Sequence, residues 1–176
     1  AYLLHWPHGD WIDIYRQMEV LYEEGLARAI GVCNFTISHF VELEKHARIM
    51  PMICQLELHP LNTKKAVREY CKEHGILVMA HTPTGRICEK IRENKALQDL
   101  ARTHKKTIAQ IIIRWHYQNN VIPVIATKTP VHMCENLDIF DFSLSEEEMQ
   151  MVEAQDEGYV MFPGNGIDDP NYIYNL

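Results

Sequence analysis

Residues 63–81, TKKAVREYCKEHGILVMAH, carry the strongest evidence for the fold. The first part, Thr63–His74, is amphipathic and typical of a helix, and Gly75 is a suitable residue to end it. The five residues Ile76–Ala80 are all apolar, as expected for a strand that is buried on both faces of a parallel sheet. A helix followed at once by such a strand indicates an α/β protein.

The same alternation of short β-branched runs and longer amphipathic stretches extends over most of the chain. The expected strands are 2–5, 29–32, 52–56, 76–80 and 121–125. The expected helices are 11–24, 36–47, 63–74, 95–104, 107–118, 130–137 and 145–154, and a turn-rich loop is expected at 81–89. Asp10 is the expected N-cap of the first helix and Ser145 that of the last. Ile14, Met18 and Leu21 form the expected apolar side of the first helix.

This order predicts a parallel sheet with right-handed crossovers and helices outside it. Five β-α units fit either a doubly wound sheet or part of a (β/α)8 barrel, and the spacing does not distinguish the two. The sequence contains no Gly-x-Gly-x-x-Gly run of the Rossmann type. In both architectures the chemistry belongs at the carboxyl ends of the strands, so the strand exits are the places to search.

The composition excludes several classes of protein. The 176 residues, 47% hydrophobic and with a formal net charge of −7, fit one domain or a piece of a larger one and are enough for a sizeable core. The acidic balance argues against nucleic-acid binding, and no apolar run approaches the roughly 18–20 residues that span a membrane. The five scattered cysteines form no Cys-x-x-Cys pair, which favours reduced thiols in a cytoplasmic protein. His5 and His8 are separated by Pro7, which prevents a regular helix there, and we expect no metal site.

The segments that follow the five expected strands are His5-Trp6-Pro7, Gly31-Val32-Cys33-Asn34-Phe35, Gln55-Leu56-Glu57-Leu58-His59-Pro60, His81-Thr82-Pro83-Thr84-Gly85, and Ala126-Thr127-Lys128 running on to Glu135-Asn136. In this order they resemble the C-terminal portion of an aldo-keto reductase, and the resemblance weakens only in residues 86–94 and after Asp156. It implies a (β/α)8 TIM barrel of which this chain covers about strands 4–8 and their helices. Residues 1–176 would be the C-terminal portion of a single barrel. Residues 156–176 would form its tail, in which Tyr172 and Tyr174 line a pocket or pack outside the barrel.

The resemblance gives the first strand exit the catalytic role. His5 matches the catalytic histidine of the family, which orients and polarises the substrate carbonyl, and a neutral imidazole has the donor and acceptor that this work needs. Seen alone, His5 would be better explained as a histidine bonded to a neighbouring carbonyl at a turn, and it is the ordered set of motifs that favours catalysis. Trp6 matches an aromatic wall of the substrate pocket, a role that is compatible with packing in the core.

The next exits match the nicotinamide side of a cofactor site. Asn34 and Gln55 match the pair of amides that holds the nicotinamide carboxamide, although Asn34 alone could cap the turn into the next helix. Cys33 stands where the family usually has Ser. His81 and Thr82 stand at the start of the family motif Tyr-Ser-Pro-Leu-Gly, and we expect His81 to stack on the nicotinamide ring.

The fifth exit matches the phosphate and adenine side. Thr127 and Lys128 would face the 2′-phosphate of NADP(H), although Lys128 alone could be a solvated surface lysine. Glu135 and Asn136 match the adenine-side contacts. His132 stands where many members carry an Arg, so NAD(H) stays an alternative cofactor.

The activity that the resemblance implies for the intact protein is NADP(H)-dependent reduction of an aldehyde or ketone to an alcohol by hydride transfer. The family's Asp, Tyr general acid and Lys precede the histidine, so we expect this chain alone to be inactive. An N-terminal part of the barrel, or self-association, would cover its exposed strand edge. The small carbonyl substrate is the other expected partner. A non-catalytic nucleotide-sensing or interaction protein on the same fold is the alternative, motivated by the departures at Cys33, His81 and His132.

Overall fold

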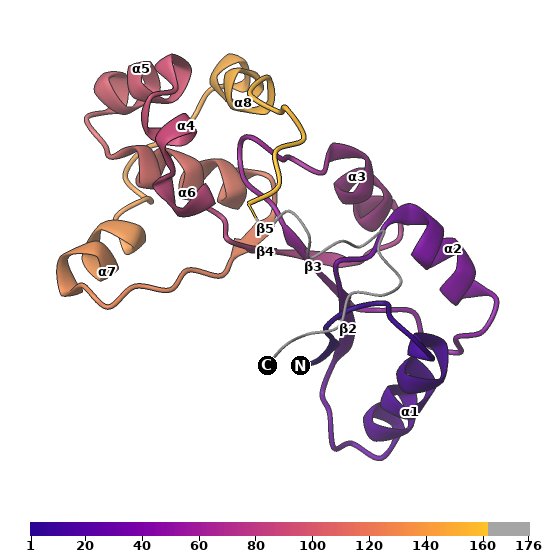
Figure 1. The fold of residues 1–176 in the computed structure, drawn as a ribbon. Helices are drawn as coiled ribbons and strands as arrows, with labels where there is room; N and C mark the ends of the chain where they lie inside the picture. The colour runs from indigo at the N-terminus through magenta and orange to yellow at the C-terminus, as the bar shows by residue number, and fades with distance from the viewer. Residues whose placement is uncertain (162–176) are drawn as a thin grey trace. The chain divides into compact units, whose positions relative to one another are not determined.

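The structure is a computed structural model that describes residues 1–161 (Figure 1). Its strands are β1 (Tyr2–Leu4), β2 (Ile30–Cys33), β3 (Ile53–Glu57), β4 (Leu77–His81) and β5 (Val121–Pro123). Its helices are α1 (Trp11–Glu23), α2 (Ile37–Glu44), α3 (Lys65–Glu73), α4 (Glu89–Arg92), α5 (Lys95–His104), α6 (Ile108–Gln118), α7 (Pro130–Leu137) and α8 (Glu146–Glu153), with a 3-10 turn at Gly85–Ile87. Each strand and helix expected from the sequence is present. Tyr172 and Tyr174 lie outside the described residues.

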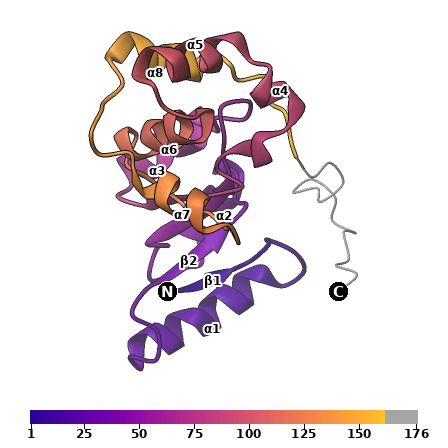
Figure 2. The same cartoon turned by 90° about the vertical axis from the view of Figure 1, so that its left-hand side faces the viewer.

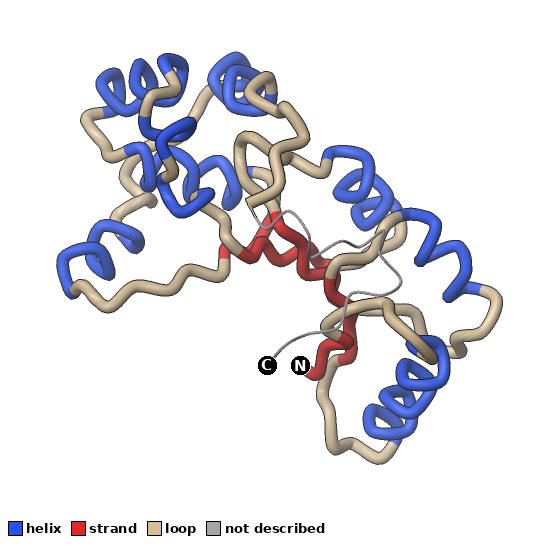
Figure 3. The backbone as a smooth tube through the Cα atoms, in the orientation of Figure 1, coloured by secondary structure: helices blue, strands red, loops and turns tan. Residues whose placement is uncertain are grey.

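The strands form one sheet of parallel strands in which spatial order follows chain order, β1-β2-β3-β4-β5 (Figure 3, red). In the pairs β1-β2 and β2-β3, Leu3 lies opposite Gly31 and Cys33 lies opposite Gln55. The connections between successive strands all contain helices. The predicted parallel α/β class is confirmed, and within residues 1–161 the strand order never reverses as it would in a doubly wound sheet.

Gly31 of β2 lies between its two register partners, Leu3 of β1 and Ile53 of β3. A Cβ atom at this position would overlap the carbonyl oxygen of Ile53 and would lie 2.7 Å from Cδ2 of Leu3. Because only glycine fits between these neighbours, this residue helps to fix the register that brings the ends of β1, β2 and β3 to one edge.

By packing, the described chain divides into two compact units. The first unit contains residues 1–56, 65–78 and Met161, and the second contains residues 57–64 and 79–160. In the first unit α1 packs against β1 and β2 (Figure 2), and Tyr15 and Phe40 are fully buried. In the second unit α6 contacts α5, α7, α8 and β5, and it contributes the fully buried Ile111 and Trp115 to the core.

The buried side of α1 differs from the expectation. Ile14 is 48% exposed, whereas Tyr15 and Glu19 are fully buried. The Tyr15 hydroxyl donates to the carbonyl of Ile49 at 3.0 Å, and Glu19 Oε1 accepts from the main-chain N–H groups of Arg48 and Ile49 at 2.6 and 2.8 Å. The helix therefore turns two polar side chains inward, because a loop distant in sequence satisfies their hydrogen bonds.

Three further expectations need correction. Asp10 occupies the N-cap of α1 but makes no capping bond, because its ψ of 43° is far from the extended conformation of a capping residue. β4 is not buried on both faces: Val78 is 6% exposed but Leu77, on the opposite face, is 41% exposed. The expected loop at 81–89 contains the 3-10 turn and the start of α4. The Ser145 cap of α8 is confirmed, since its hydroxyl accepts from the N–H of Glu148.

Candidate functional site

The candidates at the first three strand exits lie in the first unit. His5 and Trp6 follow β1, Asn34 follows Cys33 at the end of β2, and Gln55 lies in β3 beside Cys33. In a parallel sheet these positions share one edge, which is where binding residues were expected.

Asn34 connects the ends of these three strands. Its side-chain Nδ2 donates to the main-chain carbonyl of His5 at 3.1 Å, and its N–H donates to the main-chain carbonyl of Gln55 at 2.8 Å. The residue is 3% exposed, and its φ of 61° lies in the left-handed region, which Asn adopts more readily than most residues. The N-cap of α2 is Thr36, so capping the next helix is not the role of Asn34.

Gln55 and Cys33 lie side by side in the register of β3 and β2. The Gln55 side chain is partly exposed, and its amide makes no hydrogen bond with any residue in the range 1–161. Cys33 is 3% exposed, and burial raises the pKa of its thiol to about 11. At neutral pH the thiol is therefore protonated, and it can form only weak hydrogen bonds.

Aromatic and imidazole rings follow one another after β1. The exposed ring of His5 lies with its centroid 5.9 Å from that of Trp6, and Trp6 stacks on His8 at 5.7 Å and 14°. From the sequence, His8 is notable only as a possible metal ligand beside His5. The sole sequence signal for this stack is the closeness of the rings on either side of Pro7.

In the second unit, His81 ends β4 and Thr82 follows it. His81 Nδ1 and Thr82 Oγ1 are joined by a hydrogen bond of 3.2 Å. Thr82 has a φ of 52°, which is rare for a β-branched residue, and the N–H of Gly85 donates to the Thr82 carbonyl at 2.9 Å. The exit of β4 is thus a tight turn with a strained residue at its start.

The five candidates for the phosphate and adenine side lie on an exposed segment of the second unit. They are Thr127 and Lys128 in the long loop after β5, and His132, Glu135 and Asn136 on α7 (Figure 1). No residue of α7 is buried. Lys128 is exposed and forms no ion pair with any of residues 1–161. The Thr127 hydroxyl accepts from the N–H of Thr129 at 3.2 Å.

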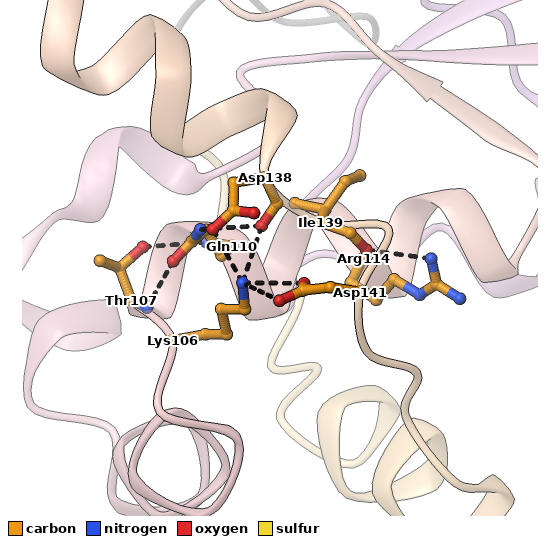
Figure 4. Close-up of polar contacts among 7 residues, drawn as sticks. All are labelled: Lys106, Thr107, Gln110, Arg114, Asp138, Ile139 and Asp141. Carbon is orange, nitrogen blue, oxygen red and sulfur yellow. Dashed lines mark hydrogen bonds and ion pairs between the residues drawn. The ribbon is translucent and has the colours of Figure 1, made fainter.

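A polar cluster that the sequence analysis did not find holds the end of α7 against α6 (Figure 4). The ammonium of Lys106 lies 2.8 Å from carboxylate oxygens of both Asp138 and Asp141. Gln110 Nε2 donates to the Asp138 carbonyl at 2.9 Å, and Arg114 donates to the carbonyl of Ile139 at 3.0 Å. The hydrogen bond from Lys106 lowers the pKa of Asp141, and the two carboxylates raise the pKa of Lys106. No spacing rule could have paired residues so distant in sequence.

Glu57 and His59 form a second cluster, from the segment that resembled the family motif after β3. Glu57 is 8% exposed and His59 fully buried, with His59 Nε2 at 3.1 Å from Glu57 Oε1.

In the part of the chain that the structure describes, no group of three or more His, Cys, Asp or Glu side chains is arranged to hold a metal ion. None of the helices within residues 1–161 has the length and apolarity to cross a membrane.

Comparison with known proteins places this arrangement in context. A model of the aldo/keto reductase family matches residues 1–157. The glyoxal reductase of Bacillus subtilis (strain 168) is 42% identical over 154 residues, which are 87% of this chain and 55% of that protein. The methylglyoxal reductase DkgA of Escherichia coli (strain K12) is 33% identical over 165 residues, 92% of this chain and 60% of that protein.

Solved structures give the same result. A crystal structure of a Bombyx mori aldo-keto reductase in complex with NADP superposes with a TM-score of 0.88 at 28% identity, covering 97% of this chain and 62% of that one. The chain therefore spans a little more than half the length of the curated relatives that it matches.

Proposed function

The chain belongs to the aldo/keto reductase family, and we propose that the protein containing it reduces a small aldehyde or ketone to an alcohol with NADPH. The observation that carries the proposal is the position of Asn34. It is bonded to the main chain of both His5 and Gln55 and so joins the candidate catalytic histidine to the candidate amide pair. The relatives named for glyoxal and methylglyoxal suggest a small dicarbonyl compound as substrate.

The chemistry of the available side chains fits a nicotinamide cofactor. A carboxamide needs both a donor and an acceptor, and the Gln55 amide offers both while making no hydrogen bond within residues 1–161. Lys128 is an exposed cation without an ion pair in the same range, as suits a contact with the 2′-phosphate of NADPH. His81 and Thr82 would contact the ring side, and Thr127, His132, Glu135 and Asn136 would contact the phosphate and adenine side.

Bound NADPH would supply the hydride. In our proposal the exposed His5 imidazole donates a hydrogen bond to the substrate carbonyl oxygen and makes the carbonyl carbon more electrophilic. The bond from Asn34 holds the main chain of His5, which fixes the point from which the imidazole side chain extends. Trp6, backed by the stacked His8 ring, would form an aromatic wall against which a small substrate lies.

We further propose that β1–β5 correspond to strands 4–8 of a (β/α)8 barrel and that residues 1–176 are the C-terminal portion of that barrel. The family's Asp, Tyr and Lys would then lie on earlier segments of the whole protein. Under this proposal the oxygen is protonated by that Tyr, and the residues described above bind, orient and polarise.

The test is an assay of the full-length protein with NADPH and a panel that includes glyoxal and methylglyoxal. We expect NADPH absorbance to fall with at least one of these aldehydes, and His5→Ala to lower kcat by about 100-fold or more, the range typical of a lost acid-base group. His46→Ala, at an exposed histidine that follows α2, is the control and should retain most of the kcat. Tight NADPH binding without turnover would instead favour the nucleotide-sensing alternative.

A further inference from the structure

We propose that His116 is a positioning residue for the cofactor, acting through the main chain of the β4 exit loop. The loop carries His81 and Thr82, so the inference rests on the proposed function. Neither the sequence nor the resemblance assigned a role to this histidine.

The contact between His116 and the loop is buried and specific. His116 lies in the last turn of α6 and is fully buried. Its Nε2 is 2.9 Å from the main-chain carbonyl oxygen of Pro83, a residue 33 positions earlier in the chain. A carbonyl oxygen can only accept a hydrogen bond, so Nε2 carries the hydrogen and donates it. The helix is thus bonded to the residue that directly follows Thr82.

The loop needs such an anchor because its backbone is strained at Thr82. This residue is β-branched, has a φ of 52° and precedes a proline. β-Branched residues rarely adopt positive φ, and a residue before proline is pushed by steric clash toward extended conformations. A conformation of this kind persists only where the surrounding structure holds it. The bond from His116 holds the carbonyl of Pro83, the residue next to the strained one, and so fixes the peptide unit between Pro83 and Thr84.

The other end of the turn is held by packing. Gly85 has a φ of +54°, and a Cβ atom there would overlap the fully buried side chain of Ile91 and would lie 3.5 Å from Cγ of His59. With Gly85 packed at one end and Pro83 bonded at the other, the turn has little freedom. The positions of His81 and Thr82, which are bonded to each other at 3.2 Å, therefore depend on the conformation of this turn. Without the His116 bond, Thr82 can relax toward an extended backbone and move both side chains.

The experiment compares three substitutions at this position in the full-length protein. Gln places an amide nitrogen near the position of Nε2, Asn places it near that of Nδ1, and Leu has no donor. His116→Gln should therefore keep the bond to Pro83, whereas His116→Asn and His116→Leu should lose it. Ile112→Ala is the control for a simple loss of packing, because Ile112 is fully buried one turn earlier on the same helix.

The measurements are the NADPH dissociation constant, by fluorescence titration, and the Tm of each variant. We expect His116→Asn and His116→Leu to weaken NADPH binding by about tenfold, the loss of one hydrogen bond, while His116→Gln stays within about threefold of the parental protein. Ile112→Ala should lower the Tm and leave the dissociation constant unchanged. If His116→Leu does not fold, the comparison of Asn with Gln decides.

The inference would be overturned if the His116→Asn and His116→Gln variants bound NADPH with equal affinity. It would also be overturned if Ile112→Ala lost as much NADPH affinity as His116→Asn. Parental protein that binds no NADPH would be a different failure. It would remove the proposed function, and the positioning role with it.

Discussion

The side chain of Asn34 donates a hydrogen bond to the main-chain carbonyl of His5 at 3.1 Å, which ties the exit of β2 to the exit of β1. The two residues are 29 positions apart and meet only because the strands are parallel neighbours with Leu4 opposite Val32. Under the proposed function, the bond places the group that polarises the substrate beside the group that contacts the nicotinamide. Correct placement of reacting groups is among the largest contributions to catalysis.

Substitutions of Asn34 should separate two contributions to stability, that of its side-chain hydrogen bond and that of its left-handed backbone conformation. Asn34→Gly keeps the left-handed φ at no steric cost and loses the bond to His5, which should lower the free energy of unfolding by about 1 kcal/mol. Asn34→Ala loses the same bond and keeps a Cβ in the left-handed conformation without the polar side chain that makes it tolerable for Asn, so it should cost about 1 kcal/mol more than Asn34→Gly. Urea denaturation of the full-length protein measures both values. An Ala variant as stable as the Gly variant would show that the positive φ imposes no strain.

Cys33 should resist alkylation at neutral pH. The thiolate is the reactive form, and burial raises the pKa of Cys33 to about 11, so very little thiolate is present at pH 7. Cys134 is exposed and serves as the internal control. We expect iodoacetamide at pH 8 to label Cys134 at least about tenfold faster than Cys33, as measured by peptide mass spectrometry. Equal labelling rates in the native protein would contradict this environment for Cys33.

Removal of the Lys128 charge should weaken NADPH binding more than NADH binding. Hydrogen bonds to a charged group contribute about 1.5–3 kcal/mol, so Lys128→Ala should raise the NADPH dissociation constant by about tenfold or more. NADH lacks the 2′-phosphate and should bind Lys128→Ala and the parental protein alike. Lys95→Ala, at another exposed lysine of the second unit, is the control and should change neither constant. A Lys128 variant that loses affinity equally for both nucleotides would rule out a role in reading the phosphate.

The cluster of Lys106, Asp138 and Asp141 should contribute to stability in a pH-dependent way. The lowered pKa of Asp141 means that its contribution is present above the ordinary carboxyl pKa of about 3.9 and is lost as the pH falls through the lowered value. The raised pKa of Lys106 means that its contribution is present below about pH 10.4 and is lost as the pH rises through the raised value.

The measurement is the stability difference between parental protein and Asp141→Asn at a series of pH values. It should be constant between about pH 6 and 8 and shrink below about pH 4. Asp13→Asn, at an exposed residue of α1 with only a 4.0 Å contact to Arg16, is the control. A difference that stays constant down to the lowest pH would mean that Asp141 gains nothing from Lys106.

The fold was largely predictable because its signals are local. The apolar run Ile76–Ala80 indicates a strand by its composition alone, and the helix cap at Ser145 and the glycine stop at Gly75 reflect contacts within a few residues. The exposure of Ile14 could not be predicted, because the orientation of α1 depends on bonds from Tyr15 and Glu19 to a loop about 30 residues away.

The candidate site was likewise predictable where its signals are local and unpredictable where it depends on contacts between distant residues. The positions of Cys33, Asn34 and Gln55 at one sheet edge followed from the parallel-strand rule. The bond from His116 to Pro83 did not, because a histidine in an apolar helix gives no sign of which distant carbonyl it contacts. The positive φ of Thr82 was equally hidden, since residue type and the following proline both argue against it.

The central claim, reduction of a carbonyl compound by hydride transfer, is tested most directly by following the hydride itself. Full-length protein is incubated with methylglyoxal and NADPH in which both hydrogens at C4 of the nicotinamide are replaced by deuterium, and the alcohol is analysed by mass spectrometry. We predict carbon-bound deuterium in the alcohol formed by the parental protein and about 100-fold less labelled product from His5→Ala. An alcohol without deuterium, or no alcohol from a protein that binds NADPH, would contradict the claim.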